Sequence, residues 1–389
     1  MIRLRAPHPD QVRSVEWRER GVTMAEVIQQ VARHHALLAR HDAADESMPH
    51  PRNCCLNLVA VAGGTDQVRQ AEQVGHALAA HHPLRQLVIE LEPAGGIERM
   101  DAWLLSEAHP TAEGMPVQFE RVRLRVSGPG VAAVDSLVAP LLVPEVPTCL
   151  WWLGTPPIAE EPFRRALELC DLLAVDSATF EQPFLTTLEL AGLAGAVGPR
   201  LAIADFHWAR LQPWREIVAQ FFQPAERRPF LRGLNAVGVD YVGEARGNRV
   251  AATLLVGWLA SALDWKLKRA AAGVGGAAAA FYGAPRGHPV EVHLRSLPSA
   301  RLAEGEVSAL RVDAMAGGHA CALAVERSED RPDHVDLRID IGEVETLRQR
   351  LPMDPPGPAE LLVEMLTARR DPVYLRALAA AAALLRAFL

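Results

Sequence analysis

The sequence predicts an α/β protein of two domains. The first is expected to have a mostly parallel sheet with helices on both faces, and the second to be an α+β domain with an antiparallel meander. Strands alternate with helices of about ten or more residues from residue 55 to residue 206, which is typical of βαβ units. Four segments between residues 289 and 342 alternate apolar and polar residues, as strands with one solvated face do. A chain of 389 residues has room for two such domains.

The first domain starts with a predicted helix over residues 22–41, where apolar side chains recur at helical spacing. A polar segment containing two prolines, residues 44–53, predicts a linker. Because the predicted strands 101–109 and 117–128 follow each other without a helix between them, we expect one antiparallel edge of the sheet. The remaining strands are predicted at 55–64, 85–93, 147–154, 171–178 and 200–206, and the helices at 65–82, 130–142, 160–170 and 179–195.

A joint rich in proline and arginine, residues 223–233, separates the domains, which we place at 1–225 and 226–389. The second domain opens with a predicted strand and then a helix that Asn248 caps and that runs to about Ala272. Two helices close the chain, and the alanine-rich last one is expected to dock on its own domain or on a second copy, which leaves self-association open. The predicted strands are 235–243, 276–283 and the meander strands 289–298, 306–316, 319–329 and 333–342, and the closing helices are 358–370 and 374–389.

Composition narrows the classes of function. The chain carries 40 Lys and Arg against 47 Asp and Glu, a formal charge of -7, which argues against a nucleic-acid partner. Its first residues lack the apolar stretch of a signal peptide, and its longest apolar run, 250–263, is too short to span a bilayer. We therefore expect a cytoplasmic protein without a membrane contact. Five cysteines without a CxxC pair predict buried free thiols and no zinc site.

The segment 205–222, DFHWARLQPWREIVAQFF, concentrates tryptophan and arginine at a corner between a strand and a helix. Pro213 suits the first turn of that helix, because its missing N–H leaves nothing unpaired there. One buried helix face is predicted from the spacing of Trp214, Ile217, Val218, Phe221 and Phe222.

Trp208, Arg210 and Arg215 fall outside this buried face. Large aromatic residues next to arginine are typical of interface hot spots, so these three are candidate partner contacts. The alternative is that they pack in the core, with the arginines paired to Asp205 or Glu216. We expect a structural role for Arg210 and an interface role for Arg215.

Two more candidate contacts come from the parallel strands. Trp151 and Trp152 must point to opposite faces of their strand, so one fills the core and Trp152 packs under a helix or meets a partner. Asp176 ends a strand at the edge where α/β sheets place ligands. The sequence has no G-x-G-x-x-G, Walker A, H-E-x-x-H or G-x-S-x-G motif, and Ser177 has no base nearby in sequence. We therefore expect no catalysis, no cofactor and no metal.

Four segments, in order along the chain, carry a family resemblance. The tryptophan- and arginine-rich segment resembles the Asp–Trp–Ala–Arg–Leu…Pro–Trp–Arg–Glu segment of the OpcA family, the glucose-6-phosphate dehydrogenase assembly proteins. Residues 143–157 are similar to that family's Pro–x–x–x–Trp–Trp–x–Gly–x–Pro–Pro element, 172–180 to its strand followed by Asp–Ser, and 254–265 to its Gly–Trp–Leu–Ala–Ser helix. The combination covers roughly residues 57–265 well, and the remainder of the chain loosely.

The resemblance implies a partner that binds glucose-6-phosphate dehydrogenase and promotes its assembly or activation in the oxidative pentose phosphate pathway. The chain departs from the family pattern at His207, where Asn is expected, and at Gln212, where Thr is expected. The residues leave a second function open, an α/β enzyme or sensor that binds a phosphorylated sugar through the Gly63–Gly64 turn and Asp176. The missing catalytic, metal and nucleotide motifs favour the first function.

Overall fold

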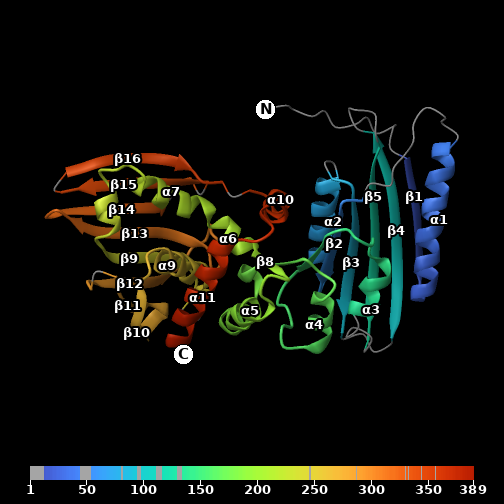
Figure 1. Ribbon diagram of the computed structural model, residues 1–389, viewed down its shortest axis with the longest axis horizontal. Coiled ribbons are helices and arrows are strands. Elements are labelled where there is room, and N and C mark those ends of the chain that lie inside the picture. The colour runs from blue at the N-terminus through green and yellow to red at the C-terminus, as the bar shows by residue number, and fades with distance from the viewer. Residues whose placement is uncertain are drawn as a thin grey trace. The chain divides into compact units, whose positions relative to one another are not determined.

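The computed structural model describes residues 13–43, 54–79, 82–93, 98–110, 116–128, 134–244, 247–285, 287–328, 330–331, 333–342, 344–354 and 356–389. The chain divides into two compact units, and each is discontinuous in sequence (Figure 1). The first unit holds Met1–Val175, Pro199–Ile203 and Pro358–Arg369, and the second holds Asp176–Gly198, Ala204–Gly357 and Arg370–Leu389. The boundary placed between residues 225 and 226 lies inside the second unit.

The first unit is built on an eight-stranded sheet in the order β1-β4-β5-β3-β2-β6-β7-β8. From β5 to β8 this is the 3-2-1-4-5-6 order of a doubly wound dinucleotide-type sheet, when the strands are numbered along the chain. The pairs β5–β3, β3–β2, β2–β6 and β6–β7 are parallel, whereas β1–β4 and β4–β5 are antiparallel, which confirms the expected edge. The strands are β1 (Arg13–Arg20), β2 (Leu56–Ala62), β3 (Leu84–Glu92), β4 (Arg99–Pro110), β5 (Pro116–Ser127), β6 (Thr148–Trp152), β7 (Leu172–Val175) and β8 (Ala202–Asp205).

Helices cover both faces of this sheet, as the sequence predicts. On β3, Gln86 Nε2 donates to Ala71 O of α2 at 2.6 Å. The neighbouring Arg85 contacts His35 of α1 at 3.2 Å, and successive strand residues point to opposite faces. The helices of the first unit are α1 (Met24–Ala43), α2 (Thr65–Ala79), α3 (Val134–Val138), η3 (Ala139–Leu141), α4 (Glu161–Leu167) and α10 (Pro358–Ala368).

The second unit contains another eight-stranded sheet, in the order β10-β11-β12-β9-β13-β14-β15-β16. Along β12, residues on one side are buried and those on the other are exposed, so one face is covered and one is open to water, as expected. The strands are β9 (Leu234–Val242), β10 (Lys266–Ala272), β11 (Ala278–Gly283), β12 (Pro289–Leu297), β13 (Val307–Ala316), β14 (His319–Arg327), β15 (His334–Ile341) and β16 (Val344–Pro352).

Three predictions about the helices and strands of the two units were incomplete or wrong. The helix that starts after Asn248, α9 (Val250–Ala262), ends ten residues before Ala272, because Asp264 turns the chain at a φ of 55° and residues 266–272 pair with β11 as strand β10. The predicted meander is interrupted, since β12 pairs in parallel with β9, which separates it from β13. Strands β1 and β16 were not predicted.

The core of the second unit includes the buried face of α7 (Gln212–Phe222). Trp214 is only 2% exposed, which confirms its predicted core position. Helix α9 is buried nearly all round and packs against the last helix, α11 (Pro372–Ala387), so the alanine-rich tail docks on its own unit. The unit's other helical segments are η4 (Ser177–Thr179), α5 (Pro183–Val197), α6 (Phe206–Arg210), α8 (Arg228–Leu231) and η5 (Val274–Gly276).

Candidate functional site

Asp176, a candidate contact from the sequence, is a helix cap and an ion-pair partner. It follows β7 directly, and its Oδ1 accepts the backbone N–H of Ala178 at 3.1 Å, at the start of η4. The same oxygen accepts a hydrogen bond from Arg210 Nη2 at 2.6 Å. Arg210 therefore pairs with Asp176, not with the nearer residues Asp205 or Glu216 that the sequence suggested.

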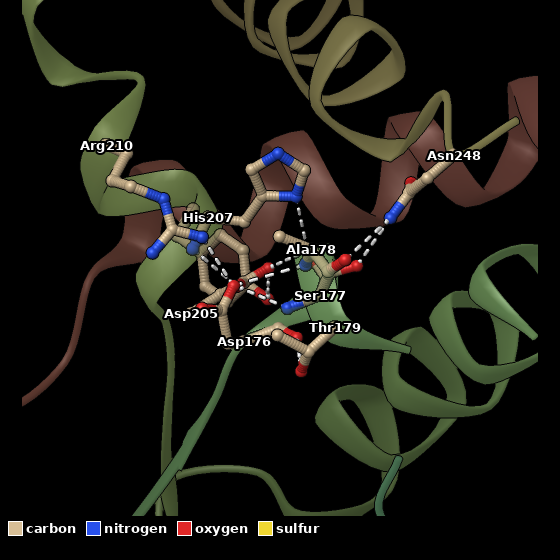
Figure 2. Close-up of polar contacts among 9 residues, drawn as sticks. Asp176, Ser177, Ala178, Thr179, Asp205, His207, Arg210 and Asn248 are labelled. Atoms are coloured by element: carbon tan, nitrogen blue, oxygen red, sulfur yellow. Dashed lines mark hydrogen bonds and ion pairs between the residues drawn. The ribbon is translucent and has the colours of Figure 1, made fainter. Parts of the chain in front are cut away.

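Asp205, the last residue of β8, is the centre of a buried polar network in the second unit (Figure 2). Its Oδ1 accepts the backbone N–H groups of Ser177 at 3.0 Å and His207 at 2.9 Å, the latter capping α6. Its Oδ2 accepts the Ser177 hydroxyl at 2.7 Å and the Tyr374 hydroxyl at 3.4 Å. Burial, with a smaller contribution from the charge of Asp176, raises the pKa of Asp205 to about 6.

The fold brings a base to Ser177 that the sequence did not show, because His207 Nδ1 lies 3.2 Å from the Ser177 hydroxyl oxygen (Figure 2). Burial lowers the pKa of His207 to about 4, so the ring is neutral at pH 7. In a hydrolytic triad the carboxylate holds the histidine ring, whereas here the Asp205 carboxylate accepts from the serine. Ser177, Asp205 and His207 are each at most 3% exposed, so a substrate does not reach them in this conformation.

Asn248 links this network to α9. Its Nδ2 donates to the carbonyl oxygens of Ser177 at 2.9 Å and Ala178 at 3.4 Å. Its Oδ1 accepts the N–H of Val250 at 3.0 Å, so it serves the first turn of α9, as predicted. A single side chain thus joins the start of α9 to the turn after β7.

Trp208 is buried and is held from two sides. Its indole Nε1 donates to Asp371 Oδ2 at 2.8 Å, and Asp371 Oδ1 also accepts the N–H groups of Val373 and Tyr374, which caps α11. The guanidinium carbon of Arg215 lies 3.6 Å from the centroid of the Trp208 ring, and Arg215 Nη2 donates to the Trp208 carbonyl at 3.4 Å. Burial lowers the pKa of Arg215 to about 10. Both candidates therefore have intramolecular contacts in the second unit.

Three aspartates share one arrangement, and together with Ser177, His207, Asn248, Trp208, Arg210 and Tyr374 they form what we call the aspartate cluster. Asp176, Asp205 and Asp371 each cap the helix that follows them. The Tyr374 hydroxyl connects the Asp371-capped helix to Asp205. Asp371 and Tyr374 are not among the candidates from the sequence, although Asp371 before Pro372 is the usual signal of a helix start.

Trp152, the remaining candidate, is 8% exposed and packs under a helix. Its ring meets Phe163 of α4 edge-on, with centroids 5.1 Å apart, and its Nε1 donates to Thr155 O at 3.1 Å. Trp151, on the other face of the strand, is 2% exposed. Of the two alternatives for Trp152, the structure shows packing under a helix.

Arg249 is a buried arginine that the sequence analysis did not single out. It is 5% exposed, and its guanidinium carbon lies 4.9 Å and 5.6 Å from the ring centroids of Phe184 and Phe388. Its Nε and Nη1 atoms have no hydrogen-bond partner within the described part of the chain. The two aromatic faces are thus its main stabilising contacts.

The Gly63–Gly64 turn lies where a doubly wound sheet binds the phosphates of a dinucleotide. Here the side chain of Gln67 occupies the turn, since its Oε1 accepts the Gly63 N–H at 2.7 Å. A Cβ built at Gly154, just after β6, would lie 3.2 Å from Gln67 Nε2. Gln67 therefore takes the place that an anion would need at this turn.

The structure also bears on the cysteines, on membrane-spanning helices and on metal sites. All five cysteines are free, as predicted. The expectation of burial is confirmed for Cys149 and Cys321, whereas Cys54 and Cys170 are half-buried and Cys55 is exposed. None of the described helices is long and apolar enough to cross a membrane. Over the same described residues, no group of three or more His, Cys, Asp or Glu is placed to hold a metal ion.

Two family models match the chain. The model for the N-terminal domain of a glucose-6-phosphate dehydrogenase subunit matches residues 75–191, and that for the C-terminal domain of the subunit matches residues 201–378. The aspartate cluster falls within these two matches, of which the first ends inside α5 and the second begins just before β8.

Curated relatives agree with the family models. The OxPP cycle protein OpcA of Synechocystis sp. is 31% identical over 232 residues, which cover 58% of this chain and 47% of the relative. The protein of the same description from Nostoc punctiforme is 33% identical over 147 residues, 38% of this chain and 30% of the relative. The chain thus spans less than half the length of these relatives.

A solved structure shares the fold. The crystal structure of an oxidoreductase from Sinorhizobium meliloti superposes with a TM-score of 0.50, covering 86% of this chain and 97% of that one. The two sequences are 11% identical, so the likeness concerns the fold alone.

Proposed function

Because this chain belongs to the OpcA family, we propose that it binds a glucose-6-phosphate dehydrogenase in the cytoplasm and promotes that enzyme's assembly or activation in the oxidative pentose phosphate pathway. The observation that carries the proposal is the match of both halves of the chain to the domains of a glucose-6-phosphate dehydrogenase subunit. The OxPP cycle description of the relatives supports the same pathway.

The proposed role is non-enzymatic. Two positive observations support it: the serine, histidine and aspartate of the aspartate cluster are buried and bonded to one another, and Gln67 occupies the turn where a nucleotide phosphate would bind. Both features are contacts within the fold, and they favour a role in binding a partner over a role in catalysis.

The experiment mixes the purified chain with glucose-6-phosphate dehydrogenase from the same organism. We expect co-elution on size exclusion and either a faster reduction of NADP⁺ or a larger dehydrogenase oligomer. The dehydrogenase of an unrelated organism serves as the control for non-specific binding. Absence of binding at micromolar concentrations, with unchanged kinetics and oligomeric state, would sink the proposal.

The non-enzymatic part has its own test. The chain alone is assayed with glucose 6-phosphate and NADP⁺, and separately for lactonase, kinase and phosphatase turnover. We expect no turnover in any of these assays. Activity that survives rigorous purification and disappears in Asp176→Asn would contradict the non-enzymatic role while leaving the partnership intact.

A further inference from the structure

The first unit contains a cavity of about 310 Å³ at the amino-terminal ends of its parallel strands. Leu56 of β2, Cys149 of β6 and Leu172 of β7 form the floor, and Val363 and Leu366 of α10 form a wall. Helix α10 belongs to the last part of the chain and is drawn in red in Figure 1. The volume lies at the small end of the range for sites that bind small molecules.

The polar groups that line this cavity carry both signs of charge. Asp171 accepts the backbone N–H of Thr148 through Oδ2 at 2.8 Å, and its Oδ1 has no partner among the residues that the structure describes. Arg369, directly after α10, is exposed, and its guanidinium makes no hydrogen bond or ion pair within those residues. An available carboxylate oxygen and an available guanidinium thus line the same apolar cavity.

We propose that this cavity binds a small α-amino acid with an apolar side chain. The Arg369 guanidinium matches the ligand carboxylate, and the Asp171 carboxylate matches its ammonium group. The apolar floor and the α10 wall receive the side chain, whose burial supplies most of the affinity. A ligand with only one charge meets only Asp171 or only Arg369, so it lacks one of the two charge-assisted contacts that the zwitterion makes.

Binding is tested on the full chain alone, by calorimetric titration and by thermal melts, so the outcome does not depend on the dehydrogenase. The probes are L-leucine and L-phenylalanine. The matched controls are 4-methylpentanoate, which lacks the ammonium group, and 3-methylbutylamine, which lacks the carboxylate. We expect saturable binding of at least one amino acid, a higher melting temperature with it, and about tenfold weaker binding of both controls.

Two substitutions locate the site. Arg369→Gln is expected to weaken amino-acid binding about tenfold, because it removes the charge that meets the carboxylate. Its matched control is Arg370→Gln, since Arg370 donates to Gly198 O at 2.9 Å and does not line the cavity. Leu366→Trp is expected to fill the cavity and abolish binding; should it misfold, the comparison of the two arginine variants still decides.

Three results would overturn the proposal. The first is no saturable binding of either amino acid at millimolar concentrations. The second is 4-methylpentanoate binding as tightly as L-leucine, which would remove the role of Asp171. The third is equal affinity in Arg369→Gln and Arg370→Gln, which would place the ligand elsewhere on the chain.

Discussion

Trp208 and Asp371 lie 163 residues apart in sequence, yet the Trp208 indole Nε1–H donates to Asp371 Oδ2 at 2.8 Å. The same carboxylate caps α11 through two backbone N–H groups. One side chain therefore fixes both the start of the last helix and the corner after β8. This relationship makes Asp371 a sensitive position for stability.

We predict that Asp371→Ala lowers the free energy of unfolding by about 2–3 kcal/mol, because the cap and the indole bond are lost together. Urea unfolding followed by tryptophan fluorescence measures the change. Asp66→Ala is the control, since Asp66 is exposed and pairs with Arg69 on the surface of α2, and its loss should change stability by less than about 1 kcal/mol. Equal losses in the two variants would contradict a special role for Asp371.

We predict that substitutions of Arg210 and Arg215 have different effects on the melting temperature and on binding to the dehydrogenase. Arg210→Ala removes the partly exposed pair with Asp176 and should lower the melting temperature, in line with its expected structural role. Arg215 was expected at the interface with the dehydrogenase, which predicts weakened binding in Arg215→Ala. Because Arg215 stacks on Trp208, we also expect Arg215→Ala to be less stable than the wild type.

Thermal melts beside a binding titration with the dehydrogenase distinguish the two roles. Arg165→Ala, which removes an exposed pair with Asp135 in the first unit, is the control for non-specific effects. A stable Arg210→Ala variant with abolished binding would show that Arg210 belongs to the interface. An Arg215→Ala variant that loses stability and binds normally would remove Arg215 from it.

Asp205 and His207 are predicted to have opposite effects on the pH dependence of stability. The folded pKa of Asp205 is raised from 3.8 to about 6, so its contribution to the free energy of unfolding falls as pH rises from about 4 to about 6. The folded pKa of His207 is lowered from 6.5 to about 4, so its contribution is lost as pH falls toward 4. Between about pH 4 and 6 the proton is on Asp205 in the folded protein and on His207 in the unfolded protein. Both states therefore hold one proton on these two residues, and the two effects on stability cancel.

Single substitutions should reveal each effect. In Asp205→Asn, only His207 titrates, and stability relative to the wild type should rise with pH by up to about 1.4 kcal/mol per unit. In His207→Asn, which introduces the residue expected from the family pattern, stability relative to the wild type should fall with pH by a similar slope. Urea unfolding at several pH values measures both, and parallel profiles for the three proteins would contradict the assignment.

Gly257 is predicted to be required for the packing of α9 on α11. A Cβ at this position would lie 2.4 Å from Ala377 O and 2.9 Å from Ala381 N, so the helices would have to separate. Gly257→Ala should therefore destabilise the protein by about 1–3 kcal/mol, despite the better helix propensity of alanine. Gly192→Ala in α5 is the matched control, because nothing lies within 4 Å of its Cβ, and it should stabilise by about 0.5–1 kcal/mol. A stabilised Gly257→Ala variant would show that the helices can adjust.

Local periodicity was sufficient for much of the fold. The spacing from Trp214 to Phe222 predicted the buried face of α7, and Asn248 was correctly expected to serve the start of α9. The alternation along β12 correctly predicted a sheet with one open face. These features depend on residues within one or two turns or on one strand, so their cause is present in the local sequence.

The local sequence pattern could not predict which distant strands pair with each other. Residues 266–272, KLKRAAA, are good helix formers, yet they form β10 because the chain turns at Asp264 and finds β11 as a partner. Strand β12 pairs in parallel with β9, and the turns that connect neighbouring strands in the sequence give no sign of this pairing. The charged edge strand β1 was missed because its few apolar residues give a weak signal.

The sequence by itself determined the family, the two kinds of sheet and the role of Asn248 at the start of α9. Only the tertiary structure decided which groups meet: Arg210 with Asp176, His207 with Ser177, and Trp208 with Asp371. A helix cap depends on backbone N–H groups a few residues away, whereas these contacts depend on where separate segments are brought together by packing. Burial of Asp205 and His207, and with it the shift of their pKa values, follows from that packing and has no local signal in the chain.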